Sequence, residues 1–118
     1  MSVNKVILLG NLGADPEVNF LPSGDTVMNF RMATSMRWTD KNTGEKKEET
    51  EWHRVTVFGK TAEALSQFLK KGKQVFVEGR LRTRKYNDKD GIERYATEIV
   101  ANTIQLVGGR NDGESQEG

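Results

Sequence analysis

The chain has 118 residues, which is enough for one small domain, and its net charge of +1 by itself argues weakly against a nucleic-acid-binding protein. It contains no cysteine, which excludes disulfides and thiolate metal sites, and no run approaches the roughly 20 apolar residues that a membrane span requires. No secretory signal precedes the first apolar run, so we expect a cytoplasmic protein.

The first half of the chain shows apolar residues in alternation or in short runs, a pattern typical of β-strands. It predicts a first strand over residues 3–12, which residues 18–21 continue after a bend. Residues 22–25 have the composition of a turn, because proline fixes φ and glycine accepts a positive φ. A second strand is predicted over residues 26–36, and the polar residues 39–50 are predicted to form a long exposed hairpin loop.

The second half contains a predicted helix over residues 61–71, since its apolar residues, Phe68 among them, share one face and Gly72 suits a helix end. Three more strands are predicted at residues 51–58, 74–86 and 92–107. Five strands with one helix between the third and the fourth is the element order of a five-stranded OB-fold barrel, so we expect an all-β fold with one helix. The folded domain is expected to span residues 1–107, and the polar, glycine-rich residues 108–118 are expected to form a flexible tail.

Two large aromatic residues share a face of the third predicted strand with an arginine. Alternation places Trp52, Arg54 and Phe58 on one face, whereas the valines and His53 lie on the other. The valines are the natural core side, so we expect the aromatic rings to point outward; the alternative is that they face the core or a partner subunit. His53, the only histidine, is expected to be an interior or subunit-contact residue rather than a catalytic one.

The fourth predicted strand repeats this arrangement with more charge, because Arg80, Arg82, Arg84 and Tyr86 share one face. An ordinary solvated face is one explanation. However, three like charges repel unless an anion lies beside them, and cations next to flat rings are what a groove for single-stranded nucleic acid needs. Trp38, near Arg37 and Lys41, is predicted to be a further stacking platform at the base of the long loop, the alternative being a cap over the barrel end.

Motifs for catalysis or for cofactor binding are missing. One histidine without cysteines cannot form a zinc cluster, and the glycines of residues 10–16 lack the Lys-Ser/Thr ending of a phosphate-binding loop. We therefore expect no enzyme activity, no cofactor and no metal.

At these residues the chain strongly resembles the bacterial single-stranded DNA-binding protein family. The resemblance covers most of the chain and is carried by VNKVIL (3–8), GNLG (10–13), DPEV (15–18), ATS (33–35), TEWHRV (50–55), FGK (58–60) and EGRLRTRK (78–85). It implies an OB-fold homotetramer in the bacterial cytoplasm, associated with the nucleoid. Such a protein wraps single-stranded DNA without marked sequence preference and protects it during replication, recombination and repair.

The resemblance also implies roles for particular residues. Base stacking falls on Trp38, Trp52, Phe58 and Tyr86, the last of which is usually tryptophan in the best-known members, so we expect weaker stacking there. His53 falls close to the subunit interface. Together with Arg80, which is predicted from its strand face, the expected phosphate contacts are Lys41, Arg54, Lys60, Lys71, Arg82, Arg84 and Lys85.

The family pattern and this sequence differ after the folded domain. Full-length members continue to an acidic tip ending in Pro-Phe that recruits partner proteins, and this sequence reaches Gly118 without one. It is then either a truncated DNA-binding core or a phage or plasmid relative, and partner recruitment is not expected of it. Two alternatives remain open, a shorter and usually dimeric primosomal OB-fold accessory protein and a structural OB domain that binds no DNA.

Overall fold

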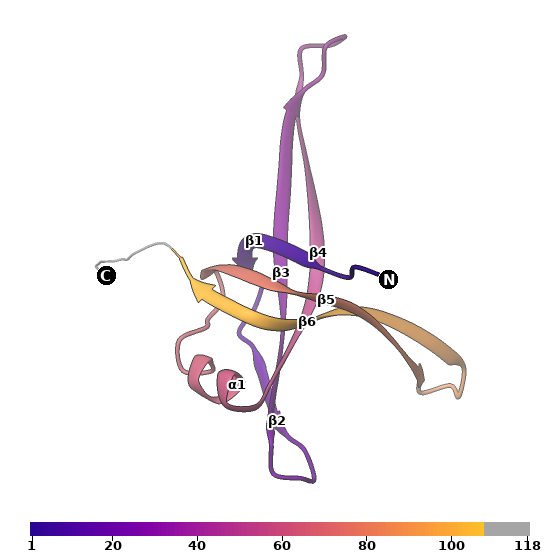
Figure 1. The fold of residues 1–118 in the computed structure, drawn as a ribbon. Helices are drawn as coiled ribbons and strands as arrows, with labels where there is room; N and C mark the ends of the chain where they lie inside the picture. The colour runs from indigo at the N-terminus through magenta and orange to yellow at the C-terminus, as the bar shows by residue number, and fades with distance from the viewer. Residues whose placement is uncertain (108–118) are drawn as a thin grey trace.

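Strands account for most of the computed structural model, which describes residues 1–107 (Figure 1). The seven elements in chain order are β1 (Val6–Leu12), β2 (Glu17–Phe20), β3 (Thr26–Thr39), β4 (Lys46–Phe58), α1 (Gly59–Leu65), β5 (Gln74–Asn87) and β6 (Glu93–Leu106). The flexible tail predicted for residues 108–118 lies outside the described residues.

The strands close into a barrel. They follow the order β1-β5-β6-β4-β3, and β1 also pairs with β3 around Asn11 and Ala33, which joins the two ends of that row. The contact between β4 and β6 is parallel and short, with Val55 opposite Ile99, whereas the other pairings are antiparallel. This confirms the predicted five-stranded OB-fold barrel with one helix. Of residues 18–21, predicted to continue the first strand, residues 18–20 instead belong to the separate strand β2 on the outer edge of β3, and residue 21 follows it.

The core lies on the valine faces that alternation predicted. Val55 and Val57 of β4 and Val75 and Val77 of β5 are almost completely buried. Each such side chain contributes roughly 1.5–3 kcal/mol relative to an exposed one. The other core residues are Leu12, Met28, Phe30, Met32, Ala62, Leu69 and Ile99. The outward faces of the same strands are therefore free to carry polar and aromatic groups.

One glycine allows the barrel to close at β1. A side chain at Gly10 would collide with the backbone carbonyl of Ala33 on β3. Since β1 must approach both β3 and β5 here, only a residue without a Cβ fits.

Two antiparallel ribbons project from the barrel in different directions (Figure 1). The β3–β4 arm comprises residues 34–51, and the β5–β6 arm comprises residues 82–98. The predicted loop over residues 39–50 is too long, because β3 continues to Thr39 and β4 begins at Lys46, which leaves only residues 40–45 between them. Cross-strand polar pairs hold this ribbon, with Ser35 Oγ 3.1 Å from Thr50 Oγ1. A ribbon with solvent on both faces has no apolar alternation, so its sequence resembles that of a loop.

The helix is shorter than predicted. It ends at Leu65 rather than at residue 71, and turns follow, in which the Ser66 hydroxyl donates to the carbonyl oxygen of Glu63. Leu69 still reaches the core, but Phe68 is 58% exposed rather than packed against the barrel. Gly72 has the expected positive φ, yet its N–H donates to the Leu12 carbonyl of β1 and does not end a helix. Between residues 1 and 107, no helix has the length and apolar composition to cross a membrane.

Candidate nucleic-acid interface

Trp52 lies on the outer surface of β4, as predicted, with 53% of its area exposed. One side of the indole rests on Gly13, where a Cβ would collide with the ring. The guanidinium of Arg31 lies over the ring, 5.6 Å from its centroid. Arg31 and Arg54 are opposite each other across β3 and β4, so the tryptophan has two cations beside it.

Three adjoining hollows surround these residues and form one groove between β3–β4 and β5–β6. The first, of about 310 Å³, has Tyr86 and Tyr95 in its lining. The other two extend it toward the β1–β2 loop, and all three share Arg31. The residues that line the groove, so defined, are Gly13, Ala14, Asp15, Glu17, Asn29, Phe30, Arg31, Trp52, Arg54, Arg84, Tyr86, Tyr95, Ala96 and Thr97.

The two other predicted stacking residues near the groove, Phe58 and Tyr86, also have an arginine over the ring. The guanidinium of Arg82 lies 5.6 Å from the centroid of the Phe58 ring, and that of Arg84 lies 5.6 Å from the centroid of Tyr86. Both rings are exposed by about two fifths. Arginine over an aromatic ring is a favourable cation–π arrangement, so the structure couples the predicted cations to the predicted platforms in pairs.

A buried carboxylate lies beside this part of β5, on the neighbouring strand β6. Glu98 of β6 is 3% exposed and accepts hydrogen bonds from Arg82 Nη2 and, at 3.0 Å, from Arg84 Nε. Burial acts to raise the pKa of Glu98, but the hydrogen bonds and charges of the two arginines outweigh it, so the pKa lies below its ordinary value. The carboxylate of Glu98 therefore offsets part of the repulsion between the arginines on this face of β5.

The predicted phosphate contacts divide into paired and unpaired cations. Besides Arg82 and Arg84, Lys85 is paired, with Glu93 at 2.9 Å. Within residues 1–107 no carboxylate lies within ion-pair distance of the other five, all of which are exposed: Lys41, Arg54, Lys60, Lys71 and Arg80. Of these five, only Arg54 lines the groove.

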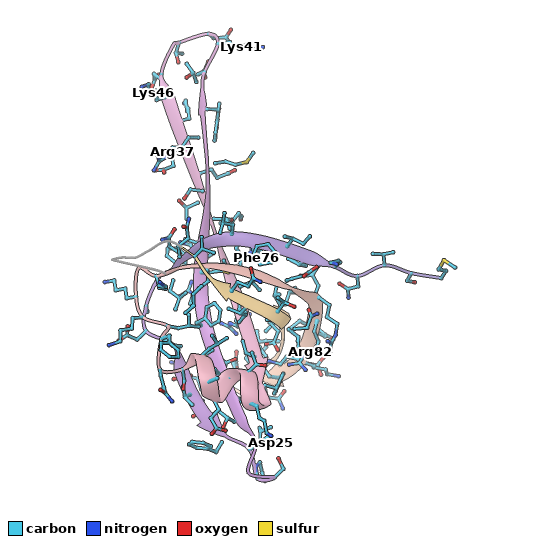
Figure 2. All side chains as sticks on the ribbon, turned by 60° about the vertical axis from the view of Figure 1, so that its left-hand side comes forward. Asp25, Arg37, Lys41, Lys46, Phe76 and Arg82 are labelled. Atoms are coloured by element: carbon cyan, nitrogen blue, oxygen red, sulfur yellow. The ribbon has the colours of Figure 1, made fainter. Side chains whose placement is uncertain are left out.

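Trp38 does not join the groove. In the β3–β4 register Trp52 is opposite Ala33, so the period of two places Trp38 on the other face of the ribbon. It lies near the end of strand β3, just before the connection at residues 40–45, and lines its own hollow with Arg37 and Lys46. Figure 2 shows Arg37, Lys41 and Lys46 along this arm, away from Arg82.

His53 is half-buried, and its Nε2 lies 2.8 Å from the Thr34 hydroxyl oxygen. It faces away from Trp52 and Arg54, as strand alternation predicted. Its expected place at a subunit interface stays a prediction.

Sequence reasoning missed three residues of this surface: Arg31, Tyr95 and Glu98. Arg31 alternates with buried Phe30 and Met32, which marks it as outward-facing, but its position over Trp52 depends on a register that the pattern does not give. Tyr95 is 67% exposed and lies on a different strand from Tyr86, so its place in the same groove depends on how β5 and β6 pair. Glu98 had no signal beyond an acidic residue in an otherwise apolar part of a strand.

Comparison with known proteins identifies the family. Residues 3–107 match the sequence model of the Single-strand binding protein family. A Plasmodium falciparum single-strand binding protein solved with single-stranded DNA has 37% identity and a TM-score of 0.78, over 91% of this chain and 95% of that one. The single-stranded DNA-binding protein of Thermus aquaticus, in a deletion mutant, has 34% identity and the same TM-score of 0.78 over 92% of this chain, which spans about half (52%) of it. The chain belongs to the single-strand binding protein family.

Proposed function

We propose that this protein binds single-stranded DNA in the groove between β3–β4 and β5–β6. The observation that carries the proposal is the set of three arginine–aromatic pairs, Arg31–Trp52, Arg82–Phe58 and Arg84–Tyr86, in or next to a surface hollow. Each base stacked on such a platform contributes about 1–3 kcal/mol. Because every base has a flat face, the binding has little sequence preference.

Phosphates are held by the cations around the groove and beyond it. Arg54 lies in the groove, while Lys60, Lys71 and Arg80 extend the basic surface over α1 and β5. These side chains displace the cations that surround the DNA phosphates, so the affinity falls as salt rises. Duplex DNA binds poorly in this account, since its bases are already stacked on one another.

The Trp38 side of the β3–β4 arm gives the strand a second contact surface, with Lys41 at its turn. A strand that reaches both Trp38 and Trp52 has to pass around the ribbon, because the two rings lie on opposite faces. This supports a curved path over the protein. We include in the proposal a homotetramer with His53 near a subunit contact; the exposed Ile7 and Leu9 of β1 support further association.

The role that follows is protection of single strands during replication, recombination and repair, in the cytoplasm on the nucleoid. The proposed function is binding without catalysis.

The test is an equilibrium titration with a labelled oligo-dT and with a duplex of equal length, at two salt concentrations. The proposal predicts tight binding of the single strand, weakened by salt, and poor binding of the duplex. Trp52→Ala should weaken binding about tenfold without unfolding the domain, whereas Phe68→Ala, an exposed aromatic outside the groove, should not change it. Equal binding of both DNAs, or none, would refute the proposal.

Light scattering tests the assembly separately. The proposal predicts four times the chain mass of 13.3 kDa. A dimer would favour the primosomal accessory protein instead.

A further inference from the structure

Glu98 is unusual among the acidic residues of the described chain because it is buried on the face that we assign to DNA. Its side chain is 3% exposed, whereas those of its partners Arg82 and Arg84 are 39% and 47% exposed. A carboxylate without partners would be costly at such a depth. The two arginines stabilise its charge there, and Glu98 in turn accepts a hydrogen bond from each of them across the β5–β6 pairing.

Glu98 also holds each arginine at a defined ring. Arg82 lies over Phe58 and Arg84 over Tyr86, and the two bonds go to different oxygens of the same carboxylate. The Nε of Arg82 is buried without an acceptor among residues 1–107, so Glu98 is the described group that fixes this guanidinium. A free arginine side chain has considerable rotamer entropy, part of which is already lost in this arrangement.

We propose that Glu98 is a positioning residue for DNA binding, which fixes Arg82 over Phe58 and Arg84 over Tyr86 before DNA arrives. The flat guanidinium planes then form part of the surface on which bases stack. This inference rests on the proposed function, and it assigns a supporting role to a residue of the same charge as DNA.

Simple electrostatics makes the opposite prediction. Removal of a negative charge from a DNA-binding face strengthens attraction for phosphates and steepens the dependence on salt. If Glu98 only diminished the positive potential, its neutral variant would bind DNA more tightly. If it positions the arginines, the neutral variant binds bases less well despite the added positive charge.

The experiment compares Glu98→Gln with Glu93→Gln, which makes the same change of charge on the same arm at an exposed ion pair with Lys85. Each variant is titrated with oligo-dT and with an abasic oligonucleotide of equal length, which has phosphates but no bases. We expect Glu98→Gln to bind oligo-dT about five- to tenfold more weakly than wild type and the abasic strand at least as tightly. We expect Glu93→Gln to bind both strands at least as tightly as wild type.

The outcomes separate the two proposals. If wild type fails to bind oligo-dT, the proposed function is wrong. If wild type binds and Glu98→Gln binds oligo-dT as tightly or more tightly, the positioning role is wrong. An equal loss on oligo-dT and on the abasic strand also contradicts it, because disturbed positions of the rings and guanidinium planes act through the bases.

Two further measurements apply if Glu98→Gln does not fold. Glu98→Asp keeps the charge but shortens the side chain, so it should weaken oligo-dT binding and spare the abasic strand; unchanged oligo-dT affinity would contradict the proposal. In free wild type, NMR should show separate, ordered Nε–H signals for Arg82 and Arg84. Averaged signals of mobile side chains would contradict it without any variant.

Discussion

The aromatic side chains of this surface differ in what covers them, and that difference sets how each can act. The Trp52 ring packs against Gly13 and has the guanidinium of Arg31 over it, so it contacts both the backbone and a cation. Tyr95 lines the same groove, and no arginine of the described residues lies over its ring. Its exposed area makes it a platform that a base can reach directly.

Tyr95→Ala should therefore weaken binding of a short oligo-dT about five- to tenfold, near the lower end of the roughly 1–3 kcal/mol that one stacked base contributes. Tyr95→Phe should retain the affinity, because the ring provides the contact. Fluorescence anisotropy of a labelled oligonucleotide measures both. Equal losses in the two variants would assign the effect to the hydroxyl group and not to stacking.

Glu98 makes the free energy of unfolding depend on pH in the acidic range. Its pKa lies below the ordinary 4.5 in the folded state, so its ionised form stabilises the fold above pH 4.5, and this contribution is lost as the pH falls from there through the folded pKa. The excess stability of wild type over Glu98→Gln should thus be constant near neutral pH and shrink below about pH 4.5. Urea unfolding at several pH values measures it.

A second lowered pKa serves as the internal control for that comparison. Asp88 accepts a hydrogen bond from Arg94 that lowers its pKa, and it titrates in both proteins, so its contribution cancels. A stability difference that does not change between pH 6 and pH 3 would show that Glu98 and the arginines are not coupled.

At the level of elements, the paired strands β3 and β4 present two different faces. Trp52 and Arg54 belong to the face that borders the groove, and Trp38 belongs to the opposite one. The arm contributes no residue between 34 and 51 to the core cluster. Its side chains can therefore change without loss of the barrel.

Trp38→Ala should weaken the binding of long DNA strands but not of short ones, because Trp38 lies on the opposite face from the groove. A strand of about eight nucleotides, near the lower range for one OB fold, fills the groove alone and should bind as in wild type. A strand several times longer passes around the arm and should bind about tenfold more weakly in the variant. Titrations with oligo-dT of both lengths check this, and a loss on the short strand alone would contradict the opposite-face arrangement.

Sequence patterns anticipated the elements whose two faces differ. The alternation of Val55 and Val57 with Trp52 predicted the inner and outer faces of β4 correctly. It could do so because these valines are buried and Trp52 is exposed. The end of β3 and the start of β4 were assigned to a loop, because both faces of that ribbon meet water. The partners of Glu98 also escaped prediction, since they depend on which residues of β5 and β6 lie opposite each other.

At the scale of the whole molecule, the near-neutral charge conceals an uneven surface. Several cations are matched by carboxylates, among them Arg37 with Glu48 and Lys85 with Glu93. Arg31 and Arg54, which have no such partner within residues 1–107, flank Trp52 in the groove. Net charge alone is thus a poor guide to binding here, because two unpaired arginines lie beside an exposed tryptophan.

The central claim is that bases stack on Trp52 in this groove, and one measurement tests it most directly. The chain has two tryptophans, so Trp38→Phe leaves Trp52 as the only source of tryptophan fluorescence. Oligo-dT at saturation should quench that fluorescence deeply, with the same midpoint as an anisotropy titration of the labelled strand. Binding by anisotropy with unchanged Trp52 fluorescence would contradict the claim.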